Sequence, residues 1–259
     1  MADADQLLRD GDVTGARAAL VDIVRSRPAD EQARMFLFQL LAVTGEWDKA
    51  RNQLQSLSQV AAEAQMLSVT YGQAIDAEKL RAEIFAGRAD MPVLMGEDTW
   101  AADLARSISL AAKGDADGAD SARDAAFEAA PDTPGSFNGD RFDWVADADS
   151  RFGPAFEAIV GGRYGLIAFD QIVSITSEGP RDLRDIIWYP VEIAFRNGQS
   201  AAAFLPARYP GSEAVDDTAL RLARATSWAD DGAGIGQRLW SFSDGDDRGL
   251  LELREVAFD

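Results

Sequence analysis

The sequence of 259 residues contains neither cysteine nor histidine. A chain without these side chains cannot build a thiolate or imidazole zinc site, an iron–sulfur cluster, a Cys–His or Ser–His–Asp nucleophile, or a disulfide framework. Any catalysis would have to use carboxylates, hydroxyls, arginine, lysine or a bound cofactor. Burial of apolar side chains must therefore hold the fold, and at this length one or two domains can bury enough surface.

Positive charge is also scarce. The chain has 25 lysines and arginines against 44 acidic residues, a formal net charge of −19, and only three of the basic residues are lysine. The acidity is even, with a net charge of −10 over residues 1–134 and −9 over residues 135–259. Such a field repels phosphate backbones and anionic lipid headgroups. Because no basic patch interrupts it, we expect neither a nucleic-acid nor a membrane partner.

Long hydrophobic runs are missing as well. The longest strongly apolar segment, Met35 to Val43, is interrupted by Gln39 and is about half of the ~20 residues needed to cross a bilayer. The first ten residues carry acids where a secretory signal has a basic stretch followed by an apolar run. An apolar share of 47% is ordinary for a globular chain. We therefore expect a cytoplasmic protein.

The first half of the chain repeats a helical pattern at the tetratricopeptide (TPR) period. Gly11 is followed by Ala16, Leu20 and Ile23, and a second copy of this pattern starts 34 residues later, at Gly45. In a helix–turn–helix repeat the glycine ends the first helix, the alanine permits close approach, and the larger residues face the partner helix. The second copy has its small and apolar residues at Ala50, Leu54 and Leu57.

A third and weaker copy starts at Gly114, with Ala119 and Ala126 in place and Arg123 where a leucine stood before. Between the second and third copies, residues 61–86 have apolar faces at helical spacing but no clean glycine turn. We therefore expect about seven helices stacked as a short, irregular solenoid. The concave side of such a stack usually holds a peptide or a helix.

The helical pattern stops at a proline- and glycine-rich cluster, residues 131–135, and short strands follow. Residues 171–176 are rich in β-branched side chains and predict a strand. Residues 188–195 and 200–205 flank Asn197-Gly198, and an Asn-Gly pair between apolar runs is the strongest short signal of a hairpin.

Three further elements are predicted in the second half. A second hairpin is expected to join residues 238–243 to residues 251–256. Helices are expected at residues 149–160 and, shorter, at residues 180–187, where a proline suits the first turn.

The whole pattern predicts two domains of different class. Residues 1–134 form an N-terminal TPR-like α-helical repeat domain. Residues 135–259 form a smaller α+β domain with a mainly antiparallel sheet.

Two motifs resemble known binding loops. Residues 244–255 have acids and a glycine at the spacing of an EF-hand calcium loop, but Arg248 puts a cation into the cage and the following residues alternate as a strand. We interpret this segment as a charged hairpin turn. The glycine-rich residues 232–236 lack the spacing of a dinucleotide-binding fingerprint and are interpreted as a loop.

Asp143, Asp147 and Asp149 form the best candidate for acid–base chemistry or Mg²⁺ binding. A structural explanation competes with it, because Asp149 suits a helix N-cap and Asp147 can pair with Arg151. No phosphate-cradling loop accompanies the cluster. We therefore assign no catalytic, cofactor-binding or metal-binding residue, and keep a carboxylate-dependent metal enzyme as the alternative.

Large aromatic side chains occur in both halves, and aromatic residues are favoured at binding hot spots. Most should be core residues, since Phe38 and Trp47 fall where a helical repeat packs on itself. The candidate partner-binding residues are Phe36, Phe38, Trp100, Trp188, Tyr189 and Tyr209.

Four blocks follow one another in a recognisable order: LFQLLAVTGEWDKAR (37–51), FDWVADADSRFGPAFEAIVGGRY (142–164), DLRDIIWYPVEIAFRNG (182–198) and PARYPGSE (206–213). With them the sequence resembles the ImpE family, also called TagJ or SciE, of accessory components of bacterial type VI secretion systems. The resemblance covers about residues 7–228. The chain departs from the family at residues 165–169, where the family has an aromatic-rich strand.

The resemblance implies a non-enzymatic adapter without a cofactor. Such an adapter binds the N-terminal amphipathic helix of the small subunit of the contractile sheath, and it is linked to the AAA+ unfoldase that recycles contracted sheath. A helical-repeat stack independently offers a groove for an amphipathic helix. The rival hypotheses are the carboxylate-dependent metal enzyme and a small-molecule sensor in the second domain.

Overall fold

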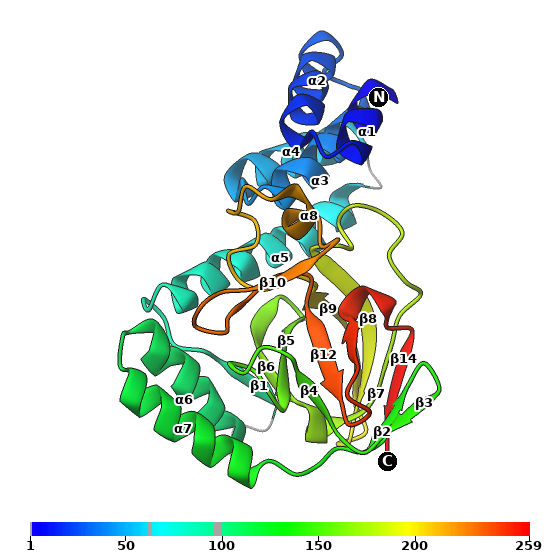
Figure 1. The fold of residues 1–259 in the computed structure, drawn as a ribbon. Coiled ribbons are helices and arrows are strands. Elements are labelled where there is room, and N and C mark those ends of the chain that lie inside the picture. The colour runs from blue at the N-terminus through cyan, green and yellow to red at the C-terminus, as the bar shows by residue number, and fades with distance from the viewer. Residues whose placement is uncertain (1, 62–63, 96–99) are drawn as a thin grey trace.

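A computed structural model describes residues 2–61, 64–95 and 100–259, and it places helices above a large sheet (Figure 1). In these ranges, seven α-helices precede residue 131: α1 Ala2–Arg9, α2 Val13–Ser26, α3 Glu31–Val43, α4 Trp47–Val60, α5 Ala64–Phe85, α6 Trp100–Ala112 and α7 Ala116–Ala129. The expected helical, TPR-like first part is confirmed. Helix α5 lies between the first four helices and the sheet, and α6 and α7 flank the sheet (Figure 1).

The glycines of the repeat pattern end helices as expected. Gly11, Gly45 and Gly114 have φ values of 85°, 67° and 84°, in the left-handed region that favours glycine. The aspartates after the first and third glycines, Asp12 and Asp115, then cap α2 and α7 by accepting a backbone N–H bond. Each repeat thus starts and stops its helices through local chemistry.

The second part of the chain is rich in β-strands. The main sheet has the strand order β1-β6-β5-β9-β8-β7-β14-β2-β3. Its strands are β1 Val93–Met95, β2 Gly135–Phe137, β3 Asp140–Phe142, β5 Ala155–Val160, β6 Arg163–Ala168, β7 Ile172–Thr176, β8 Trp188–Phe195, β9 Ser200–Pro206 and β14 Glu255–Phe258. All described pairs are antiparallel except β1 with β6, so the mainly antiparallel sheet is confirmed.

Two small sheets and three short helices complete the description. The small sheets are made by β13 Asp247–Gly249, β12 Leu239–Phe242 and β4 Val145–Asp147, and by β10 Thr226–Trp228 with β11 Gly234–Gly236. The short helices are α8 Thr218–Arg221 and the 3₁₀ turns η1 Phe169–Gln171 and η2 Leu250–Glu252.

The hairpin predicted around Asn197-Gly198 is present. Strands β8 and β9 pair from Trp188 opposite Pro206 to Ala194 opposite Ser200, and Gly198 adopts a φ of 84° in the turn. The strand predicted at residues 171–176 is also present as β7. Both signals are local, which explains why the sequence reveals them.

Two predicted helices are wrong. Residues 149–160 form a turn followed by strand β5, because Gly153 has positive φ and Pro154 follows it. Every residue of β5 except the last is buried, so its apolar run lacks the alternation that marks a strand. Residues 180–187 form turns, since the Asp185 carboxylate accepts the backbone N–H groups of Arg181 and Asp182 and competes with a helix.

The second predicted hairpin has the wrong partner. Strand β12 pairs with β13, whereas β14 crosses into the main sheet and pairs with β7 and β2. The 3₁₀ turn η2 redirects the chain between them, and it buries Leu250 and Leu253 in the core of the sheet. Hydrophobic alternation marks a strand but does not say which sheet it joins.

The apolar core continues from the helices into the sheet. Phe38 of α3, Tyr71 of α5 and Trp188 of β8 pack with ring centroids 5.6 to 6.5 Å apart. A second cluster, which includes Phe156, Phe169 and Trp240, fills the other face of the sheet. Burial of each such side chain contributes roughly 1.5–3 kcal/mol to the free energy of folding. None of the helices in the described part of the chain combines the length and the apolar character required to cross a membrane.

Candidate functional site

The structure buries most of the aromatic residues that were expected to bind a partner. Phe38, Trp188, Tyr189 and Tyr209 are fully buried and Trp100 is 8% exposed. These five side chains therefore pack the interior rather than offer a surface. Phe36 is the exception, since it is partly exposed and lines a groove.

The buried aromatic residues use their polar tips to join distant elements. The Trp188 indole donates to the Glu78 carboxylate of α5 over 3.1 Å. The Tyr189 hydroxyl donates to the Leu253 carbonyl over 2.6 Å. The Tyr209 hydroxyl lies 3.1 Å from an Asp147 oxygen. Each ring thus fills the core while its polar atom finds a partner.

A buried ionic network connects α5 to the sheet. Arg81 of α5 forms a two-pronged ion pair with Glu157 of β5, with N–O distances of 2.7 and 2.8 Å. Arg238 pairs with both Glu157 and Asp147, and the Tyr164 hydroxyl donates to Glu157. Burial acts to raise the pKa of Glu157, but the two guanidinium groups and the hydrogen bonds prevail and hold that pKa at about 2.

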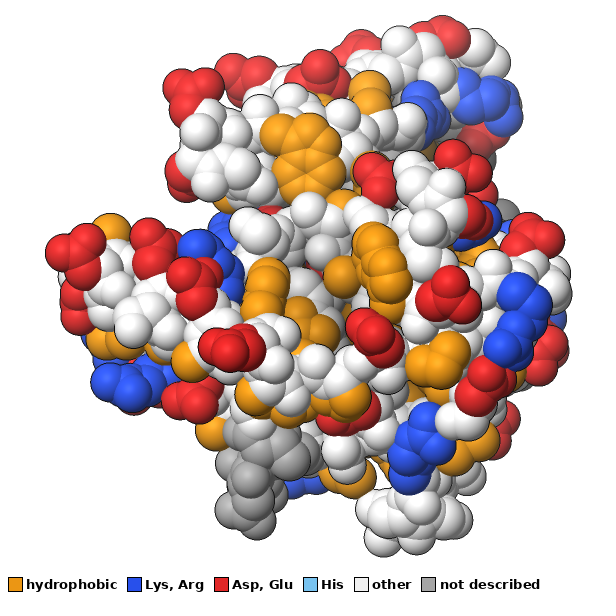
Figure 2. All heavy atoms as spheres, turned by 60° about the horizontal axis from the view of Figure 1, so that its bottom comes forward, with side chains coloured by type: hydrophobic (Ala, Val, Ile, Leu, Met, Phe, Trp, Pro, Cys, Tyr) orange, Lys and Arg blue, Asp and Glu red, His pale blue; other side chains and the backbone are white. Residues whose placement is uncertain are grey.

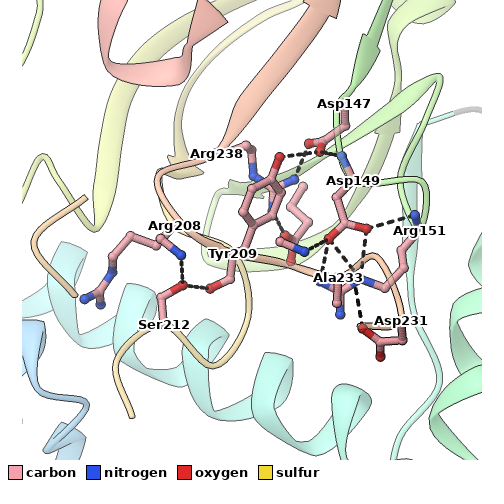
Figure 3. A network of polar contacts seen from close by, with 12 residues as sticks. Asp147, Asp149, Arg151, Arg208, Tyr209, Ser212, Asp231, Ala233 and Arg238 are labelled. Atoms are coloured by element: carbon pink, nitrogen blue, oxygen red, sulfur yellow. Dashed lines mark hydrogen bonds and ion pairs between the residues drawn. The ribbon is translucent and has the colours of Figure 1, made fainter. Parts of the chain in front are cut away.

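Two of the three candidate acidic residues meet in this network (Figure 3). One Asp147 oxygen accepts the Asp149 backbone N–H over 3.0 Å and faces Tyr209, while the other pairs with Arg238. Burial is the main cause that raises the pKa of Asp147 to about 6. Asp149 is fully buried and binds the Arg151 guanidinium and the Gly234 backbone N–H. Both carboxylates therefore have partners within the fold.

The third candidate, Asp143, is exposed, and its backbone N–H donates to the Ser243 hydroxyl. Across residues 2–61, 64–95 and 100–259, no three acidic side chains lie close enough together to hold a metal ion. The loop resembling an EF-hand is a turn between β12 and β13, in which Arg248 pairs with Asp244. The Arg248 guanidinium thus supplies the positive charge that a calcium ion supplies in an EF-hand loop.

An apolar groove of about 440 Å³ lies between α3, the end of α4 and the start of α5. Its apolar walls are formed by Met35, Phe36, Leu57, Ala61, Ala64 and Leu67. The polar residues along it are Glu31, Gln32 and Gln39. An apolar groove of this kind can receive the apolar face of a helix.

One side of the groove, from Leu57 to Leu67, comes from the least charged stretch of the chain. Residues 52–75 contain one charged residue, Glu63, in a protein in which 27% of residues are charged. Val60, Met66 and Val69 in this stretch are 47%, 74% and 60% exposed. By contrast, acidic side chains are spread across the face shown in Figure 2. The missing charge is a sequence signal that could have located the groove.

Another part of α3 is covered by the second half of the chain. Arg208 donates to the Val43 carbonyl over 2.9 Å, and Phe38 stacks against Trp188. At the α3–α4 turn, a side chain at Gly45 would start 2.6 Å from Glu213. The sheet-rich part therefore occupies helix surface that a partner would otherwise reach, and it leaves the groove at the start of α3 accessible.

Comparisons with known proteins agree with this architecture. Residues 139–257 match the ImpE protein family, and residues 7–69 match the tetratricopeptide repeat family. The X-ray crystal structure of protein VPA1032 from Vibrio parahaemolyticus has the same fold, with a TM-score of 0.87 at 20% identity over 99% of this chain and 97% of that chain.

A curated relative is much more similar in sequence. The type VI secretion system accessory component TagJ of Pseudomonas aeruginosa is 44% identical over 257 residues, which is 99% of this chain and 91% of TagJ. A likeness of this extent, together with the match at residues 139–257, shows common family membership. The chain therefore belongs to the ImpE family, together with the type VI secretion accessory component TagJ.

Proposed function

We propose that this protein is a non-enzymatic adapter of a type VI secretion system that binds the N-terminal amphipathic helix of the small sheath subunit. The observation that carries the proposal is the apolar groove between α3, α4 and α5, along which the described wall carries one charged residue. Apolar grooves of this kind receive the apolar face of a helix through anchors spaced by three, four and seven residues. Kinship with an accessory component, TagJ, supports the same role.

The ion pairs of Asp147 and Asp149 support an adapter over the alternative metal enzyme. Both carboxylates are buried and bound to arginines, so they connect elements of the fold and are not open to a metal ion. In the proposed division of labour, residues 1–134 hold the sheath helix. Residues 135–259 brace the helices and offer a surface for the sheath-recycling AAA+ unfoldase. Such a role is cytoplasmic.

Isothermal titration calorimetry with a peptide of the first ~20–30 residues of the cognate small sheath subunit tests the proposal, since a peptide of this length is only marginally helical alone and orders on binding. Leu67→Glu puts a charge into the groove wall and should weaken binding about tenfold or more. Val173→Glu is the matched control, because Val173 is an exposed apolar residue of β7, outside the groove.

The Val173→Glu protein should bind the peptide like the wild type, and both variants should keep a wild-type melting temperature to within a few degrees. Absence of heat and of peptide ordering with the wild-type chain would refute the proposed partner. Equal weakening by both substitutions would refute the groove as the site.

A further inference from the structure

We infer that Glu31 sets the direction of the bound helix by pairing with a lysine or arginine on it. The inference rests on the proposed function and concerns the same groove. Glu31 is the one charged residue along the described groove wall, and it lies at the end where α3 begins. Along α3, the described wall of the groove therefore runs from the charged Glu31 to the uncharged Gln39.

The groove has the length of two helical turns. Along α3 its lining residues run from Glu31 to Gln39, a distance of about 12 Å at 1.5 Å per residue. A partner helix laid along this length contacts it with three anchor positions, i, i+3 or i+4, and i+7. Apolar anchors fill the middle, beside Met35 and Phe36, and one end of the helix comes to lie at Glu31.

The Glu31 carboxylate is free to meet a cation. It is exposed, and it forms no ion pair or side-chain hydrogen bond with the residues that the structure describes. The nearby cations are directed elsewhere: Arg27 pairs with Asp30 over 3.1 Å, and Arg34 binds the Gln53 side chain and the Pro28 carbonyl. Nothing among the described residues neutralises the Glu31 carboxylate.

The chemistry of the partner follows from this arrangement. An apolar groove whose described wall carries a single charge, at Glu31, fits a helix that presents an apolar stripe and one lysine or arginine at the end of that stripe. Reversing the helix or sliding it by one turn moves the cation by at least ~5 Å and leaves Glu31 unpaired. An exposed ion pair adds little affinity, so Glu31 favours one orientation of the helix by the same few-fold factor by which it strengthens binding.

Calorimetry with the sheath peptide tests this inference on the full-length chain. Glu31→Gln should weaken binding about two- to fivefold and Glu31→Lys about five- to tenfold at low salt, with smaller effects at high salt. Glu128→Gln and Glu128→Lys on α7 are the matched controls, because Glu128 is also exposed but lies outside the groove. A peptide with its matching lysine or arginine changed to glutamate should regain affinity for the Glu31→Lys protein.

Three results would overturn the inference. The first is equal binding by the Glu31 and Glu128 variants, and the second is failure of the charge-reversed peptide to rescue. The third is a Glu31 effect that vanishes when the peptide N-terminus is acetylated, because that would assign the contact to the terminal amine. In all three cases the wild-type chain binds the peptide and the proposed function stands. Absence of wild-type binding refutes the proposed function itself.

Discussion

The two halves of helix α5 differ sharply in charge and in which side chains they bury. Residues 64–75 have no charged side chain, whereas residues 76–85 have five. The uncharged half exposes Met66 and Val69, and the charged half buries Glu78 and Arg81. This inverts the usual rule, by which charged residues stay outside and large apolar residues go inside.

The inversion separates two tasks along one helix. Buried ion pairs add little net stability compared with apolar packing, but breaking one is costly, so they restrict how two parts of a fold dock. The Arg81–Glu157 pair fixes α5 on the sheet in this way. Exposed apolar side chains do not stabilise the isolated chain, and where they form a contiguous patch they commonly mark a contact with a partner. The charged half of α5 thus fixes the helix on the sheet, and the uncharged half exposes apolar side chains to solvent.

The largest effect is expected from breaking the charged half. Arg81→Met leaves Glu157 and Glu78 buried with fewer cationic partners and should lower the free energy of unfolding by about 3–5 kcal/mol. Urea denaturation followed by circular dichroism measures this change. Lys79→Met on the same turn is the control, since the exposed Lys79–Asp48 pair should cost less than about 1 kcal/mol. Similar losses in the two variants would contradict the role of the network.

The second-largest expected effect is the dependence of the free energy of unfolding on pH. The pKa of Glu157 is about 2 in the fold, below its ordinary value of 4.5, so its stabilisation is present above pH 4.5 and is lost as the pH falls toward 2. The pKa of Asp147 is raised from 3.8 to about 6, so its contribution is present below pH 3.8 and is lost as the pH rises through 6.

The two opposite shifts predict maximal stability near pH 4, between the ordinary pKa values of the two groups, with a fall of about 1–2 kcal/mol toward pH 7. Asp147→Asn cannot titrate and should flatten the fall between pH 5 and pH 7. Unfolding free energies measured across this range check the prediction. A wild-type profile that rises steadily from pH 5 to pH 7 would contradict it.

The smallest expected change in stability comes from a substitution in the uncharged half of α5. Gly72 lies inside α5, and a methyl group added there would meet no atom within 4 Å. Gly72→Ala should raise the free energy of unfolding by about 0.5–1 kcal/mol, because glycine is costly within a helix. Gly45→Ala should lower it, since Gly45 has a φ of 67° and Glu213 lies against it. Thermal unfolding should therefore show changes of opposite sign, which would confirm that Gly72 is an ordinary helical position and that Gly45 requires glycine. Changes of the same sign would contradict this.

The sequence predicts those features that depend on local chemistry. Gly11 and Gly45 mark helix ends through their left-handed backbone, and Asn197-Gly198 marks a hairpin. Strand β5 was predicted as a helix because burial on both of its faces removes its alternation. Local patterns also cannot pair Arg81 with Glu157, which lies 76 residues away.

In the candidate site too, the sequence predicts local features and misses those that depend on long-range packing. The aromatic residues predicted to bind a partner are mostly buried, because aromatic character suits a core as well as a hot spot. The near absence of charge in residues 52–75 marks one wall of the groove in the sequence. Its position beside Phe36 and Leu67 depends on the packing of three helices, which no single segment encodes.

The central claim is that the uncharged half of α5 receives a partner while the charged half holds the fold together. Hydrogen–deuterium exchange of the full chain, with and without the sheath peptide, tests it most directly. We expect the peptide to slow amide exchange in residues 31–39 and 52–75, which supply the groove wall, and to leave residues 76–85, already held by the ionic network, unchanged. Protection confined to the sheet or to residues 76–85 would contradict it.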